Sequence, residues 1–277
     1  MDDVLTALLE ARRAGRDAAL LTVVDAWGMT PARPGLHLAL VEDGATAGTV
    51  GGGALEKAAI ARARERLADQ STELVTIALR GDEAVLATGG EPALEGSTAG
   101  VRLFIEYAGR GIRVHLFGAG HVGRCVAAAL AGQPLFLTLY DERPQPEPVP
   151  GADRVIVSDY AGALATHPPR PGGYYVIATP QHEADYLLLR AIMGGALAPA
   201  YVGMVGSKGK SRGMIQRLRD ELGDAAPWDV LHTPIGLDLG GRTPAEIAIS
   251  IAAEIQAVRY GRPRPIPSLR MATDGAR

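Results

Sequence analysis

The stretch Val114 to Asp141 constrains the fold more than any other part of the chain. A short apolar run, VHLF, leads into glycines at 118, 120 and 123 in complete GxGxxG spacing, then into a helical segment and a second apolar run that ends in an acid. In a βαβ unit such glycines allow a tight turn, admit a pyrophosphate to the backbone and let the helix pack closely on the strand. The pattern therefore predicts a Rossmann-like fold that binds a dinucleotide or a similar phosphate-bearing ligand.

Two details of this stretch bear on the ligand. The start of the helix presents free N–H groups to phosphates, and Asp141 follows the first glycine by roughly 20 residues, where an acid commonly holds ribose hydroxyls. The alternative is a glycine turn that merely closes a doubly wound sheet, because 35 of the 277 residues are glycine.

Strand-like and helical patterns continue to alternate after this stretch, which predicts a parallel sheet. Strands are expected at 154–157, 174–178 and 201–205, and helices at 159–165, 182–193 and 208–222. A last helix begins at Pro244, where Thr243 and Glu246 form a TPAE capping box with proline at the first helical position.

The chain is expected to be an α/β protein of two domains. Residues 1–108 mix helices at 3–14 and 54–68 with strands and predict an α+β domain, and residues 109–262 predict a Rossmann-like, doubly wound parallel-sheet domain. The Pro/Arg-rich residues 263–277 are predicted to be a disordered tail.

Composition excludes several classes of function. A net charge of −3, with no basic stripe interleaved with aromatic residues, argues against nucleic-acid binding. No run of eighteen apolar residues and no basic, signal-like N-terminus is present, so we expect a cytoplasmic protein without a membrane span. The single cysteine, Cys125, excludes an internal disulfide, and the scattered histidines give no support to a metal site.

Ligands of open α/β sheets bind outside the carboxyl ends of the strands, so the residues after each strand are the candidates. Five segments are expected to converge on one crevice, namely 118–123, 141–143, 158–159, 179–182 and 206–210. The last contains Lys208 and Lys210, two of the three lysines of the chain. This clustering predicts an anion site at a helix start, with a solvated helix start as the alternative.

Two histidines follow predicted strands. His121 stands inside the glycine turn and His182 opens the helix after the fourth strand, where either could hydrogen-bond a ligand or act as acid or base near neutral pH. Each could equally be a cap or a packed residue.

In the N-terminal domain, Gly51-Gly52-Gly53 precedes a helix with Glu56 in its first turn and offers amides for a second anion contact. A tight strand-to-helix joint explains these glycines as well.

Several segments together resemble the XdhC/CoxI family, the accessory factors of xanthine dehydrogenase and related molybdenum hydroxylases. They cover essentially the whole chain: LTVVDAWGMTPARPG, VEDGATAGTVGGGALEKA, VHLFGAGHVGR, YVGMVGSKGKSRGMIQRL and TPIGLDLGGRTPAEIAISIAAEIQAVRYG. The resemblance implies an N-terminal XdhC/CoxI domain, a Rossmann-like domain and a homodimer.

The resemblance also implies a function. The protein would bind the molybdenum cofactor, a pterin that bears phosphate, protect it while its metal acquires a terminal sulfur, and hand it to an apo molybdenum hydroxylase. A cysteine desulfurase is implied as a further partner. The matching site residues are Gly51, Gly52, Gly53 and Glu56 of the GGGCxE motif, Gly118, Gly120, His121 and Gly123 of the GAGHVG turn, Thr179 in the turn after the fourth strand, and Gly206, Ser207 and Lys208 of the GSxxK segment.

This chain departs from the family pattern at the cysteines. Ala54 stands where the family usually has cysteine, and the second family cysteine, expected near Thr98 to Gly100, is missing. Thiolate ligation of molybdenum from these positions is therefore excluded. The resemblance then implies a member that holds the cofactor through pterin and phosphate alone, or one with another task.

An NAD(P)-dependent oxidoreductase acting on a small carbonyl or imine is the alternative function, so whether the chain is an enzyme stays open. The glycine turn would take the pyrophosphate, Asp141 the ribose, and His182 or Lys208 would be the catalytic acid in hydride transfer. Asp141 favours NAD, whereas Arg143 is compatible with the extra phosphate of NADP. A third, non-catalytic possibility is a nucleotide-sensing partner of a larger enzyme.

Overall fold

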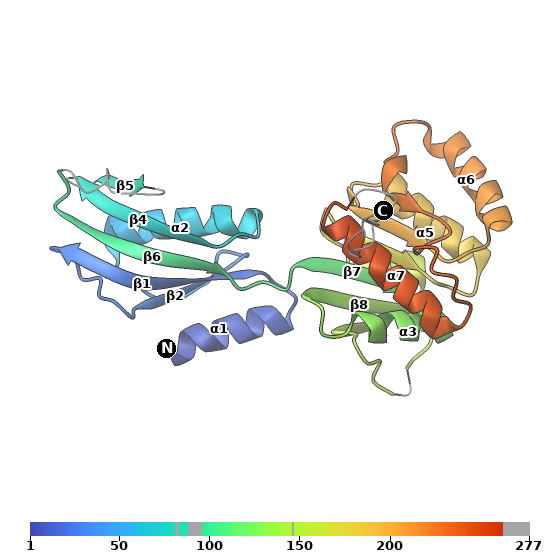
Figure 1. The fold of residues 1–277 in the computed structure, drawn as a ribbon, viewed down its shortest axis with the longest axis horizontal. Helices are drawn as coiled ribbons and strands as arrows, with labels where there is room; N and C mark the ends of the chain where they lie inside the picture. The colour runs from blue at the N-terminus through green and yellow to red at the C-terminus, as the bar shows by residue number, and fades with distance from the viewer. Residues whose placement is uncertain (81–82, 88–95, 146, 263–277) are drawn as a thin grey trace, which may run out of the picture. The chain divides into compact units, whose positions relative to one another are not determined.

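The computed structural model describes residues 1–80, 83–87, 96–145 and 147–262, so the tail predicted from residue 263 onward lies outside the described residues. The chain divides into two compact units, one ending at Gly111 and the other beginning at Ile112 (Figure 1). The boundary predicted from the sequence is residue 108. Each unit has its own sheet.

The first unit is built on an antiparallel sheet with the strand order β3-β2-β1-β6-β4-β5. The strands are β1 (Ala18–Gly28), β2 (His37–Val41), β3 (Thr46–Gly48), β4 (Glu73–Arg80), β5 (Glu83–Ala87) and β6 (Ala99–Tyr107). Helix α2 (Gly53–Ala68) covers one face, where its Leu55, Ala59 and Ala63 join the buried core. Helix α1 (Asp2–Arg13) packs through Ala11 against the paired residues Ala18 and Val41.

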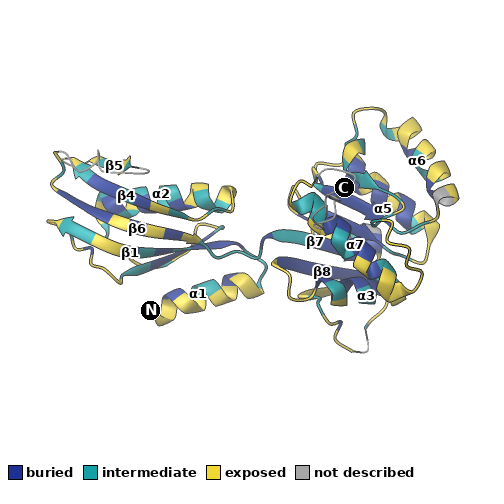
Figure 2. Ribbon diagram, viewed as in Figure 1, coloured by how far each residue is buried: buried dark blue, intermediate teal, exposed yellow. Residues whose placement is uncertain are grey.

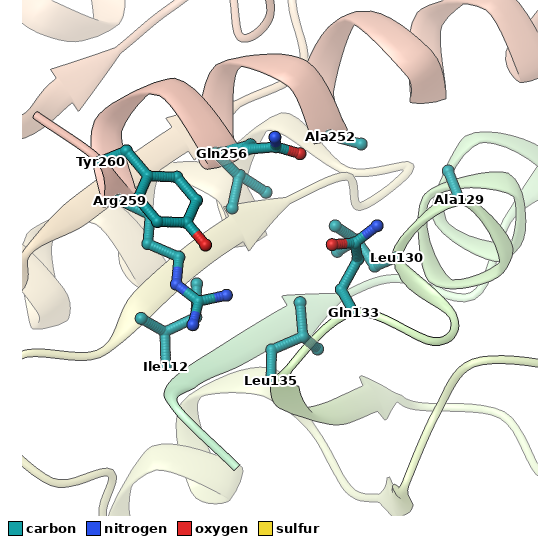
Figure 3. A pocket seen from close by; sticks show the side chains of 10 residues that line it. Ile112, Ala129, Leu130, Gln133, Leu135, Ala252, Gln256, Arg259 and Tyr260 are labelled. Carbon is teal, nitrogen blue, oxygen red and sulfur yellow. The ribbon is translucent and has the colours of Figure 1, made fainter. Parts of the chain in front are cut away.

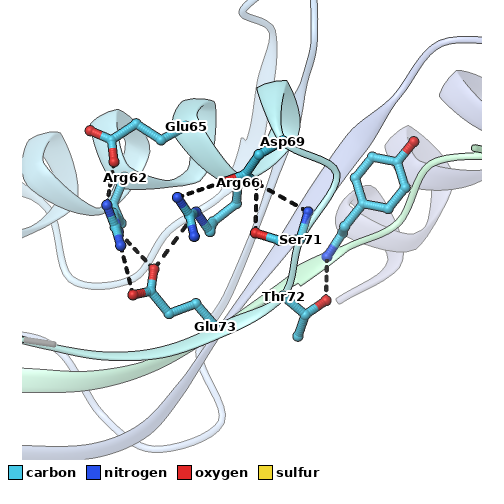
Figure 4. Close-up of polar contacts among 8 residues, drawn as sticks. Arg62, Glu65, Arg66, Asp69, Ser71, Thr72 and Glu73 are labelled. Atoms are coloured by element: carbon cyan, nitrogen blue, oxygen red, sulfur yellow. Dashed lines mark hydrogen bonds and ion pairs between the residues drawn. The ribbon is translucent and has the colours of Figure 1, made fainter. Parts of the chain in front are cut away.

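An ionic network joins α2 to β4 (Figure 4). The Arg62 guanidinium donates from Nε to Glu73 Oε2 and from Nη2 to Glu73 Oε1, both at 2.7 Å, and the Glu73 side chain is only 16% exposed. Arg62 also pairs with Glu65, whose side chain is 58% exposed. The hydrogen bonds from Arg62 hold the pKa of Glu73 below its usual value.

We expect the Glu73→Gln variant to lose about 1–2 kcal/mol of unfolding free energy, because it breaks a two-pronged, largely shielded ion pair. The Glu65→Gln variant is the matched control, since it removes an exposed partner of the same arginine and should cost under about 0.5 kcal/mol. Urea unfolding of both variants measures the difference. Equal losses would show that burial of Glu73 adds nothing to this pair.

The second unit is a six-stranded, fully parallel sheet with the order β12-β11-β10-β7-β8-β9. Its strands are β7 (Ile112–Phe117), β8 (Leu135–Asp141), β9 (Arg154–Val157), β10 (Tyr174–Ile177), β11 (Tyr201–Met204) and β12 (Leu231–His232). Every residue of β8 is buried, as Figure 2 shows in dark blue. Such continuous burial is typical of a parallel strand covered on both faces.

Helices cover both faces of this sheet. They are α3 (His121–Leu130), α4 (Tyr160–Thr166), α5 (His182–Gly194), α6 (Lys208–Leu222) and α7 (Pro244–Arg259). Helices α3 and α7 share one core with Val114 and Leu137, whereas α4, α5 and α6 contribute to the core that contains Phe117, Tyr175 and Ile177. The doubly wound parallel sheet predicted from the sequence is thus confirmed.

The start of α7 confirms a second prediction in atomic detail. The Thr243 side chain accepts a hydrogen bond from the Glu246 amide, and the Glu246 carboxylate accepts one from the Thr243 amide at 2.9 Å, with Pro244 at the first helical position. This reciprocal box satisfies amides that would otherwise lack partners.

Candidate functional site

The carboxyl edge of the parallel sheet collects the segments that the sequence singles out. Strands β7, β10 and β11 end side by side, because Ile177, the last residue of β10, is paired with Phe117 of β7 and with Met204 of β11. Asp141 is the last residue of β8. From β7 the chain turns through α3 to β8, whereas from β10 it turns through α5 to β11. The winding direction therefore reverses between β7 and β10, and open α/β sheets bind their ligands at such a point.

The three glycines of the first turn have different surroundings. Gly118 has φ +103°, and a Cβ on it would lie 2.4 Å from the Ala178 carbonyl oxygen; a Cβ on Gly123 would lie 1.9 Å from the Gly118 carbonyl oxygen. Gly120 has φ −68°, and a Cβ there would meet no atom within 4 Å. Packing and backbone conformation thus explain two of the glycines, but they leave open space above Gly120, where a ligand can approach the backbone.

Three helices that follow strands at this edge begin without a side-chain cap. The N-cap residues Gly120 of α3, Gln181 of α5 and Ser207 of α6 make no capping hydrogen bond with their side chains. By contrast, Asp159 caps α4 and Thr243 caps α7. Helices α3 and α6 also lack an acid in the first turn, so the helices after β7 and β11 present unneutralised amides and positive dipole ends. Such ends bind phosphate and other anions.

Asp141 lies at this edge but is fully buried. Its Oδ2 accepts from the Ala119 amide at 2.6 Å, and its Oδ1 accepts from the Arg143 amide at 2.9 Å and from the Arg143 Nε at 3.0 Å. Burial would raise the pKa of Asp141, but these hydrogen bonds hold it below the usual value. The carboxylate therefore braces the glycine turn, and a ribose would have to compete with Arg143 for it.

His182 belongs to a small polar group after β10. Thr179 Oγ1 donates to Asp185 Oδ1 at 2.6 Å, and His182 Nδ1 lies 3.9 Å from Asp185 Oδ2. Burial raises the pKa of Asp185, which is only 4% exposed, against the lowering effect of the Thr179 hydrogen bond. A buried acid with a raised pKa beside a histidine is a common feature of functional sites.

Sequence reasoning missed Asp185, because an acid in the first turn of a helix is expected merely to complement the helix dipole. His182 also lines an open pocket of about 400 Å³ that lies between α5 and α6; its other lining residues are Glu183, Tyr186, Gly213, Met214 and Arg217. The His182 side chain is 65% exposed, so it is accessible to a ligand in this pocket.

The remaining predicted residues of the second unit are placed by the backbone. His121 is the first residue of α3, Gly206 follows β11 closely, Ser207 is the N-cap of α6 and Lys208 is its first residue. All four stand at the carboxyl edge.

A smaller pocket of about 70 Å³ lies at the opposite, amino end of the sheet, where the strands β7 and β8 begin and the helices α3 and α7 end (Figure 3).

Gly51, Gly52, Gly53 and Glu56 belong to the first unit. The three glycines have φ values of +123°, +71° and +62°, which disfavour other residues. Oε2 of Glu56 accepts from the amides of Val50 at 3.0 Å and Gly52 at 3.1 Å, and from the Thr49 hydroxyl. These bonds outweigh the effect of burial and lower the pKa of Glu56. The loop is an anion nest whose anion is the chain's own carboxylate, so an external phosphate would have to displace Glu56.

No group of three or more potential metal ligands among His, Cys, Asp and Glu occurs within the described residues. Cys125 is half-buried and packs against the core shared by α3 and α7. In the part of the chain that the structure describes, no helix combines the length and apolarity that crossing a membrane requires.

By its fold the second unit is a Rossmann-type domain. Comparison with protein families agrees: residues 114–255 match the XdhC Rossmann domain, and residues 11–78 match the XdhC and CoxI family. The chain belongs to the XdhC and CoxI family.

Two curated proteins are similar in sequence to this chain over part of their own length. YqeB of Escherichia coli (strain K12), an uncharacterized protein, is 30% identical over 253 residues, which are 88% of this chain and 44% of YqeB. A probable xanthine dehydrogenase subunit from Bacillus subtilis (strain 168) is 27% identical over 160 residues, 57% of this chain and 46% of that protein. The chain thus spans less than half the length of these curated relatives.

A solved structure of similar extent also exists. A crystal structure described as a xanthine dehydrogenase from Bacillus halodurans is 19% identical in sequence, with a TM-score of 0.48, and the match covers 95% of this chain and 97% of that one.

Proposed function

We propose that this chain is an accessory protein of a xanthine dehydrogenase-type molybdenum hydroxylase, and that it binds the molybdenum cofactor and delivers it to the apo-enzyme. The observation that carries the proposal is the open backbone at Gly120, the N-cap of α3, at the winding switch point where α3 and α5 both begin without a side-chain cap. A phosphate there receives hydrogen bonds from several amides without a covalent link. Such binding is reversible, as delivery requires.

The donor set suits the phosphate and pterin of the cofactor better than its metal. With Ala54 at a family cysteine position and Cys125 packed against the core, the described residues offer no cluster of thiolates to molybdenum. We therefore assign the affinity to the phosphate contacts at the turn of Gly118 to Gly123 and at Gly206, Ser207 and Lys208. The protein would shield the cofactor while its own metal ligands stay unchanged.

An NAD(P)-dependent oxidoreductase is the second candidate function. The glycine turn favours it, and His182 beside buried Asp185 would be its acid or base. The hydrogen bonds of Asp141 weigh against this function, because the acid expected to hold a ribose already accepts bonds from Ala119 and Arg143. We accordingly prefer a ligand that needs no ribose hydroxyls at this position.

The proposal includes a cytoplasmic homodimer that interacts with the apo-hydroxylase and with a cysteine desulfurase. These elements rest on the family resemblance. Light scattering coupled to size exclusion tests the dimer, and co-purification with each candidate enzyme tests the partners.

The deciding assay mixes purified protein with molybdenum cofactor released from a molybdoenzyme, and then adds an apo-hydroxylase. We expect the protein to retain cofactor through gel filtration and to increase the activity recovered by the apo-enzyme. Calorimetric titration with NAD, NADH and NADPH is run in parallel. Micromolar binding of a nicotinamide dinucleotide, combined with no cofactor capture, would replace the proposed function with the second one.

A further inference from the structure

A buried polar cluster joins one side chain of α7 to β11, to β12 and to the segment that follows β12. Glu254 of α7 is 2% exposed. Its Oε2 accepts from the Tyr201 hydroxyl at 2.7 Å and from the Gly236 amide at 2.9 Å, and its Oε1 lies 3.2 Å from His232 Nδ1. The rings of Tyr201 and His232 lie against each other, with centroids 4.6 Å apart.

This carboxylate is held in its charged form. Burial would raise the pKa of Glu254, but hydrogen bonds from His232, Gly236 and Tyr201 together lower it to about 2. Burying a charge is costly unless several groups compensate it, and an apolar residue at the same place would fill the core at a lower cost. Filling the core therefore does not by itself account for this cluster.

The segment that Glu254 holds is bonded to both sides of the loop after β11. The Ile235 amide donates to the carbonyl oxygen of Met204, the last residue of β11, at 3.0 Å. The Thr233 hydroxyl donates to Ser211 Oγ, in the first turn of α6, at 2.9 Å, and Ser211 is 2% exposed. Hydrogen bonds from Ile235 and Thr233 thus fix both ends of the loop 205–207, and these two residues belong to the segment that Glu254 holds through His232 and Gly236.

We propose that Glu254 is the positioning residue of the Gly206–Ser207 loop, and that through residues 232–237 it sets the start of α6 for an anionic group at the carboxyl edge. This inference rests on the proposed function for the identity of that group, the cofactor phosphate. Glu254 itself contacts no ligand. It acts through the Gly236 amide and His232 on one side and through Thr233 and Ser211 on the other.

The test compares Glu254→Gln with Ile255→Ala. The control variant removes a buried apolar side chain at the next position of α7, which lines the small pocket at the amino end of the sheet, and it is expected to destabilise the unit by cavity formation while leaving every hydrogen bond of the Glu254 cluster in place. Hydrogen exchange of the folded proteins is measured by peptide. With Glu254→Gln we expect faster exchange in 205–212 and 232–237, while 118–123 keeps its wild-type rate. With Ile255→Ala we expect no increase in exchange that is restricted to these two segments.

Affinity for molybdenum cofactor released from a molybdoenzyme is the second readout, and we expect it to fall about tenfold in Glu254→Gln but not in Ile255→Ala. Tyr201→Phe, which removes one donor, should change both readouts in the same direction by less, and it replaces Glu254→Gln if that variant does not fold. Wild-type exchange in 205–212, or undiminished affinity, would overturn the proposal. If the wild-type protein binds no cofactor, the proposed function fails, and the exchange pattern alone decides whether Glu254 holds the loop.

Discussion

The Gly123→Ala variant is expected to lose about 3 kcal/mol of unfolding free energy, because the added Cβ would lie 1.9 Å from the Gly118 carbonyl oxygen and the backbone would have to move. Gly120→Ala in the same turn is the matched control. Its Cβ enters open space at an ordinary φ of −68°, so a change within about 0.5 kcal/mol is expected.

Urea unfolding of the two variants and the wild-type protein measures this difference. The comparison isolates the effect of close packing at Gly123, since the two substitutions are chemically identical and only three positions apart. Equal stability losses would mean that the turn does not have the close helix–strand approach described above.

Asp141→Asn is the second substitution with a large expected effect. The asparagine keeps one acceptor oxygen, but it removes a fully buried charge and turns an amide donor toward the buried backbone donors of Ala119 or Arg143, whose guanidinium is itself 66% exposed, so we expect a loss of about 2–3 kcal/mol at pH 7. Asp159→Asn, at the exposed cap of α4, is the control and should cost under about 1 kcal/mol.

The pH dependence of stability provides a sharper check on Asp141. Its pKa in the folded protein lies below the ordinary value of 3.8, so its contribution to stability is fully present above that value and is lost as the pH falls through the lower folded pKa. The destabilisation caused by Asp141→Asn should therefore shrink as unfolding is measured at progressively lower pH, below about 4. A difference that stays constant down to the acid limit would contradict the ion pair.

Much of the second unit could be predicted from the sequence because its signals are local. The glycine spacing, the apolar runs of β7 and β8 and the capping box of α7 each depend on neighbouring residues alone. The strands β3, β5 and β12 were not predicted. Strands β3 and β12 have three and two residues, too few for an alternating pattern, and all three strands pair with a longer or more buried neighbour, β5 with β4.

The candidate site was less accessible to sequence reasoning, since its charges are set by distant contacts. Asp141 was correctly placed at a strand end, but nothing local shows that Arg143 turns back onto it and that Ala119 donates to it. The hydrogen bond that Asp185 accepts comes from Thr179, which lies before the helix start. Glu254 gave one readable signal, a single acid within the apolar stretch AISIAAEIQAV, although its partners come from β11 and β12.

The most direct test of the central claim is the equilibrium binding of released molybdenum cofactor to the wild-type protein and to Gly120→Ala. If the phosphate lies against the open backbone of the turn, one added methyl group should raise the dissociation constant at least about tenfold, equivalent to about 1.4 kcal/mol, while urea unfolding stays unchanged. Equal affinity of the two folded proteins would place the cofactor elsewhere and contradict the account.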